Sequence, residues 1–193
     1  MLPKEYIGYF AAQLAKRLEK SGVVRFQNEA IAAEKLHQVL AADVAQEDML
    51  NQEVRDTLEQ YQERIRRDAI SYQEMYKLVK REVMKKHKIT IVNRPEADGA
   101  KYSRDKVIDL SHKMIKALAD MGAAQAELLA EKNDVRLEII RQMQGLLKEE
   151  SVMDRGVRDK IKSQKREIAE GSGEWDILFR KYYSEELRKL GVA

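Results

Sequence analysis

The chain has 193 residues, of which 36 are Lys or Arg and 33 are Asp or Glu, so that its net charge is +3. Because it contains two prolines, nine glycines and no cysteine, its composition favours long helices and excludes disulfides, thiolate zinc sites and cysteine nucleophiles. The near-balance of charge lacks the marked basic excess that is typical of nucleic-acid-binding domains. The uncharged run from Tyr6 to Ala15 is too short to span a bilayer. We therefore expect an all-α cytoplasmic protein without a membrane role.

The two halves of the chain resemble each other. A shift of 100 positions aligns Ile7, Phe10, Leu14 and Leu18 with Val107, Leu110, Met114 and Leu118. A shift of 103 positions aligns Val54-Arg55-Asp56 with Val157-Arg158-Asp159. Self-similarity of this kind indicates a duplicated structural unit. We predict two tandem related helical units of about four helices each, comprising residues 1–88 and 102–193, joined by a linker over residues 89–101.

In the first unit, apolar residues recur at steps of three and four, which is the spacing of amphipathic helices. The first helix begins near Pro3 and stops at Gly22. A second helix follows over residues 31–40, and Asn51 caps a third. Ser71 and Glu74 have the capping-box spacing at the start of a fourth. In the linker, residues 89–92 are all β-branched, and such residues favour a short extended segment.

The second unit repeats this order. Ser103 is the expected N-cap of its first helix, and Gly122 is the expected stop. The second helix carries Leu137, Ile140 and Met143, and Asp154 occupies the position of the Asn51 cap. The sequence Gly-Ser-Gly at residues 171–173 interrupts the helical pattern before the last helix. We interpret it as a hinge or helix break.

The C-terminal stretch is the most distinctive part of the sequence. Gly171-Ser172-Gly173-Glu174-Trp175-Asp176 is followed by Tyr182-Tyr183, by Glu185-Glu186-Leu187 and by Gly191. This end resembles that of an uncharacterised bacterial family, domain of unknown function family 507, and the segments from Tyr6 to Leu18 and from Val157 to Ile161 resemble it as well. The resemblance implies a bacterial, cytosolic, helical protein. It carries over no catalytic residue.

No group of residues predicts catalysis, a cofactor or a metal ion. Glu34 and His37 have the Glu-x-x-His spacing of di-iron helical bundles, but this pair occurs once and no other helix supplies a partner. The adjacent acidic pairs, such as Glu149-Glu150, point in different directions on a helix and do not form an acid–base site. We therefore expect a protein that is not an enzyme and that has no small-molecule substrate.

Positive charge gathers in one segment. Between positions 77 and 94 there are seven basic residues against one acid: Lys77, Lys80, Arg81, Lys85, Lys86, Lys88 and Arg94. Such a stripe can neutralise phosphates, or it can be an ordinary solvated helix face. A second basic run lies at residues 155–166. If the two form one positive surface, nucleic-acid binding is favoured; if acids interleave with them, it is not.

Trp175 is the only tryptophan, and Tyr182 and Tyr183 follow two turns later. Their helical spacing is that of core residues, whereas Trp and Tyr are also enriched in protein-binding hot spots. The hypothesis that we prefer is a non-enzymatic interaction or adaptor protein that binds another protein or itself, with Trp175, Tyr182 and Tyr183 as candidate contacts. The alternative is an RNA- or DNA-binding protein that uses the stripe at residues 77–94.

Overall fold

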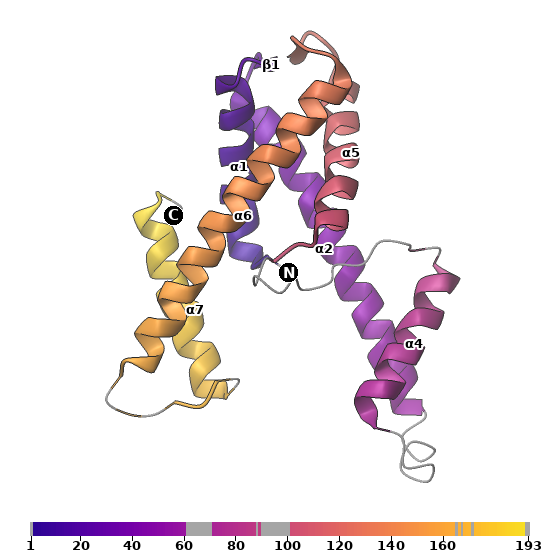
Figure 1. The fold of residues 1–193 in the computed structure, drawn as a ribbon, viewed down its shortest axis with the longest axis vertical. Helices are drawn as coiled ribbons and strands as arrows, with labels where there is room; N and C mark the ends of the chain where they lie inside the picture. Colours follow the sequence, from indigo (N-terminus) through magenta and orange to yellow (C-terminus); the bar gives the residue numbers. More distant parts are fainter. Residues whose placement is uncertain are drawn as a thin grey trace.

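The computed structural model describes residues 2–60, 71–87, 89, 101–164, 166, 168–170 and 172–191. Within this part of the chain there are six helices and two short strands (Figure 1). They follow in the order α1 (Lys4–Lys20), β1 (Val24–Phe26), α2 (Glu29–Gln60), α4 (Tyr72–Lys86), α5 (Arg104–Asp120), β2 (Ala126–Leu128), α6 (Lys132–Lys162) and α7 (Gly173–Lys189). The all-α class is confirmed. The extended segment predicted at residues 89–92 lies, apart from Ile89, outside the described residues.

Several predicted helix ends are confirmed. Gly22 and Gly122 both follow helix ends with φ of 77°, the left-handed conformation that glycine adopts without strain. The Ser103 side chain accepts a hydrogen bond from the backbone N–H of Lys106 at the start of α5. Ser71 and Glu74 form the predicted capping box at the start of α4. These local signals therefore fix four ends of three helices, α1, α4 and α5.

The prediction of separate second and third helices in each half is wrong. Asn51 and Asp154 are not caps, since each lies inside one uninterrupted helix, α2 or α6. Neither position has a glycine or proline to break the helix, and Asn or Asp costs only a few tenths of a kcal/mol, about 0.7 at most, in a helix interior. Their side chains bind neighbouring elements instead: Asn51 accepts from Lys80, and Asp154 accepts from Lys101.

Two strands that the sequence analysis did not predict join the halves at one end of the molecule. β1 and β2 pair antiparallel, with Arg25 opposite Glu127. The guanidinium of Arg25 lies 2.8 Å from the Glu127 carboxylate across the pair. Three-residue strands are too short to show the alternation by which strands are recognised in a sequence.

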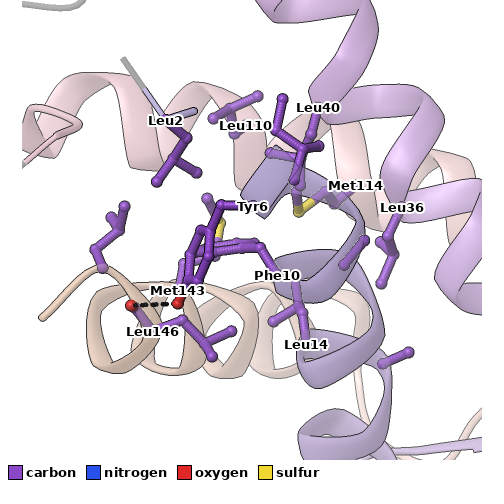
Figure 2. Close-up of a cluster of buried hydrophobic side chains, with 14 of the residues drawn as sticks. Leu2, Tyr6, Phe10, Leu14, Leu36, Leu40, Leu110, Met114, Met143 and Leu146 are labelled. Atoms are coloured by element: carbon purple, nitrogen blue, oxygen red, sulfur yellow. Dashed lines mark hydrogen bonds between the residues drawn. The ribbon is translucent and has the colours of Figure 1, made fainter. Parts of the chain in front are cut away.

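Helices α1, α2, α5 and α6 form a bundle around one main core. Tyr6, Phe10 and Leu14 of α1 point into the centre of the bundle (Figure 2). They meet side chains from the other three helices: Leu36 and Leu40 of α2, Leu110 and Met114 of α5, and Met143 and Leu146 of α6. The main core therefore draws on both halves of the chain.

Two arms extend from the bundle and diverge (Figure 1). In the first arm, α4 packs on the C-terminal part of α2; in the second, α7 packs on the C-terminal part of α6. Four buried residues of the first arm, Leu50, Val54, Leu58 and Val83, form a cluster of their own, here called the α4 cluster. The buried residues of α7 belong to the main core. None of the described helices combines the length and the apolar character that crossing a membrane requires.

Candidate functional site

The structure separates the basic residues of α4 into two sets. Lys80 and Lys86 turn toward α2, where Lys80 Nζ donates to Asn51 at 2.9 Å and Lys86 Nζ lies 2.8 Å from a Glu53 oxygen. Lys77, Arg81 and Lys85 are exposed on the other side of the helix. Lys88 and Arg94, which complete the predicted stripe, lie outside the described residues.

The second basic run, at residues 155–166, lies in the second arm and not beside α4 (Figure 1). Acidic side chains interleave with it. Arg158 binds Asp154 and Glu170, and Lys160 Nζ lies 2.9 Å from Glu185. Arg166 and Lys162 also have acidic partners. The two basic runs do not form one positive surface within the described part of the chain.

Two of the three aromatic candidates are core residues. Trp175 and Tyr183 expose only 4% and 3% of their surface. The Tyr183 hydroxyl donates to Glu150 Oε1 at 3.1 Å, and burial raises the pKa of Tyr183 far above its usual value. Tyr182 is half-buried, with its ring under Lys160 Nζ at 4.0 Å. In this fold Trp175 and Tyr183 therefore anchor α7, and neither is open to a partner.

A groove lies between α1, α6 and α7 and is open to solvent. Its volume is about 480 Å³. The floor is one stripe of α6 that includes Val152, Met153 and Gly156, at the three- and four-residue spacing of a helix face. Tyr6 and Tyr9 of α1 form one wall, and the end of α7 forms the other with Glu186, Lys189 and Leu190. Because most of these groups are apolar, the groove suits apolar side chains.

The groove is open because apolar groups of its lining have no cover. Val152 exposes 63% of its surface and Leu190 exposes 47%. The charged groups at the rim are paired with each other across short distances. Arg17 donates to Glu149 at 2.7 Å, and Lys189 Nζ donates to Glu186 at 2.6 Å. An occupant of the groove therefore meets exposed hydrocarbon flanked by neutralised charges.

Gly156 leaves space at the middle of the floor. A Cβ atom added there would have no heavy atom within 4 Å, so that packing does not require glycine at this position. The corresponding residue of the first arm, 103 positions earlier, is Glu53. Its carboxylate lies 2.8 Å from Lys86 Nζ and 2.6 Å from His87 Nε2, and these hydrogen bonds lower the pKa of Glu53. The same position is therefore empty in one arm and filled by an ion-pair cluster in the other.

A buried carboxylate lies next to the groove. Glu150 is fully buried between Tyr183 and Lys101, whose Nζ lies 3.8 Å from Oε1, and Oε2 has no hydrogen-bond partner. Burial raises the pKa of Glu150. A second buried acid, Asp43, lies 2.7 Å from Lys106 Nζ between α2 and α5. These groups hold helices together, and among the described residues no three His, Cys, Asp or Glu side chains are placed to bind a metal ion.

Sequence reasoning missed the groove. The one signal for it in the sequence was Gly156, a glycine that lies inside a helical pattern without ending the helix. The walls come from residues 6–9 and 186–190, and no periodicity in either segment indicates that they meet.

Comparison with family models gives a match over residues 1–192 to a family described as a protein of unknown function, DUF507. The chain belongs to the DUF507 family. The resemblance of its C-terminal stretch is thus confirmed over the whole chain. Comparison with curated proteins finds no match. The DUF507 description assigns no activity.

Proposed function

We propose that this chain is a non-enzymatic interaction protein, and that the groove between α1, α6 and α7 receives an apolar helical segment of a partner protein. The open floor at Gly156 carries the proposal. Glycine in a helix interior costs about 1 kcal/mol relative to alanine, and no neighbouring atom requires it here. A partner whose backbone or side chain approaches α6 closely would explain why the position carries no side chain.

The chemistry of the lining fits this mode of recognition. Amphipathic helices bind by laying apolar side chains at three- and four-residue spacing into a hydrophobic groove. Tyr6 and Tyr9 offer aromatic faces, and Met153 offers a flexible thioether that adapts to different shapes. The volume of about 480 Å³ suits a few side chains of a helix rather than a flat protein surface.

A groove-filling variant tests the proposal. Gly156→Leu places a side chain on the floor, whereas Gly8→Leu is the matched control, because Gly8 also lies inside a helix with no atom within 4 Å of an added Cβ. Each variant and the wild type would be used to isolate partners from the native cell at low salt, with nuclease, and each partner would then be reconstituted with the purified chain. We expect a stoichiometric protein that binds the wild type and Gly8→Leu and is lost with Gly156→Leu. If the wild type and both variants retain the partner equally, the proposal that the groove binds it is refuted.

Nucleic-acid binding, the alternative function, is a further outcome of the same experiment. It would appear as RNA or DNA that copurifies without nuclease and leaves at moderate salt. The contacts of Lys80 and Lys86 with side chains of α2 and the acids around residues 155–166 argue against it.

We also propose that the chain is a tandem duplication. The seven buried residues of α1 lie at positions 6, 7, 10, 11, 14, 15 and 18, and those of α5 lie 100 positions later at 106, 107, 110, 111, 114, 115 and 118. In α2 and α6, Ala32, Leu36 and Leu40 correspond to Val135, Ile139 and Met143 with a shift of 103. These matches support the division into residues 1–88 and 102–193. The absence of cysteine agrees with the cytoplasmic location that we propose.

A further inference from the structure

The outer face of α4 carries cations that the fold does not use. Lys77 and Arg81 are exposed, and no hydrogen bond or ion pair joins either side chain to another described residue. Lys85 continues the same stripe, with only an exposed contact of 2.8 Å to Glu82. Residues four apart on a helix lie about 6 Å apart along its axis, so that the three form one continuous row. We call Lys77, Leu78, Arg81 and Lys85 the α4 outer stripe.

An apolar side chain lies within this row. Leu78 exposes 50% of its surface beside Lys77 and one turn before Arg81. A phosphate backbone offers no apolar surface to such a side chain. A helix that combines carboxylates with apolar residues offers both, since carboxylates at four-residue spacing match the cations and a leucine or similar group covers Leu78.

Within the described part of the first arm, α4 packs on α2. The α4 cluster draws only on α2, α4 and Ile89. In the second arm, Tyr6 of α1 reaches α7, where its ring centroid lies 6.5 Å from that of Tyr183.

We infer that the α4 outer stripe docks an acidic amphipathic helix of a partner protein. Charge complementarity with Lys77, Arg81 and Lys85 orients the helix, and contact with Leu78 adds apolar burial. The surface is distinct from the groove on the second arm, so each assignment can fail without the other.

The test uses the full chain and synthetic probes in fluorescence anisotropy at low salt. The first probe is a labelled helical peptide with Glu at every fourth position beside a stripe of Leu. The second has Ser in place of Leu, and the third is a single-stranded RNA of equal charge. We expect the Glu/Leu peptide to bind most tightly. Lys77→Glu with Arg81→Glu should weaken its binding by about tenfold, because two exposed ion pairs become repulsive contacts.

The matched control lies on the other arm. Arg180 and Arg188 occupy the positions of Lys77 and Lys85 on α7 and are also exposed, but Ser184 stands where α4 has Arg81. Arg180→Glu with Arg188→Glu should change the affinity by less than about twofold, and Leu78→Ser should weaken only the Glu/Leu peptide. Gly156→Leu should have no effect on any probe. The inference is overturned if the Glu/Leu peptide does not bind, if both double variants weaken it equally, or if RNA binds more tightly than the peptide.

Discussion

The two arms have the same architecture and different packing. In the second arm, α7 contributes Trp175, Tyr183 and Leu187 to the main core, and its polar partner Glu150 is fully buried. In the first arm, Val83 is the one buried residue of α4, and it packs in a separate cluster. The groove is open at Gly156 of the second arm, whereas Glu53, Lys86 and His87 occupy the corresponding place in the first. The bundle positions correspond closely between the halves, so the difference between them is concentrated in the arms.

The largest expected effect comes from the residues that begin the arm helices. Trp175 is buried, whereas Tyr72, 103 positions earlier, exposes 55% of its surface. We expect Trp175→Ala to lower the free energy of unfolding by about 3–5 kcal/mol and Tyr72→Ala by about 0.5 kcal/mol or less. Urea denaturation followed by circular dichroism measures both. Similar losses in the two variants would show that the arms contribute equally to the core.

A closer match is offered by two valines at corresponding positions. Val54 and Val157 are 0% and 1% exposed, but Val54 lies in the α4 cluster and Val157 in the main core. We expect Val157→Ala to lower the global free energy of unfolding by about 2 kcal/mol. Val54→Ala should mainly destabilise the first arm. The midpoint temperature at which the bundle unfolds should therefore change less in this variant than in Val157→Ala. Differential scanning calorimetry of both variants provides the measurement. A larger loss in the global free energy of unfolding for Val54→Ala than for Val157→Ala would contradict the separation of the two clusters.

The buried Glu150 gives the second arm a pH dependence. Because burial raises its folded-state pKa above the unfolded value, folding favours the protonated form. The stabilising contribution is complete below the unfolded pKa and is lost as pH rises through the folded pKa. Glu150→Gln keeps a group that can bind Tyr183 and removes the buried charge, while Lys101 retains Asp154 at 2.8 Å. We expect the variant to be more stable than the wild type at neutral pH, by about 1 kcal/mol.

This advantage of Glu150→Gln should shrink as the solution is acidified toward the unfolded pKa. Thermal unfolding of the wild type and the variant across the acid-to-neutral range provides the measurement. A variant that is less stable at neutral pH would indicate that the ion pair with Lys101 at 3.8 Å outweighs the cost of burial.

The smallest effect concerns the glycines. Gly156→Ala and Gly8→Ala both add a Cβ atom to open space in a helix interior. We expect each to raise the free energy of unfolding by about 0.5–1 kcal/mol. Equal gains would show that Gly156 has no role in folding, and a loss at Gly156 alone would point to a packing constraint. Chemical denaturation of both proteins is sufficient.

The sequence predicted the parts of this fold that depend on local chemistry. Helical periodicity, the caps at Ser71 and Ser103 and the stops at Gly22 and Gly122 were all readable, because each acts within a few residues. Asn51 and Asp154 were wrongly predicted as caps, since residues that favour caps also serve as interior partners for distant lysines. Their role depends on α4 and on Lys101, which no local pattern places.

The candidate site was less predictable than the fold. Its floor and walls come from three helices, and Gly156, which leaves the floor open, lies in a different helix from the residues of either wall. Trp175 and Tyr183 looked equally suited to a core and to an interface. Only the packing of α7 against α6 and α1 decides between these roles.

Native-state hydrogen exchange tests most directly the claim that the arms differ in how they are joined to the bundle. Amides in the middle of α4 and α7 would be compared in the same sample of the full chain. We predict that α4 exchanges through a local opening with a free energy well below that of global unfolding, whereas α7 exchanges only when the bundle unfolds. Equal protection of the two helices, or weaker protection of α7, would contradict the account.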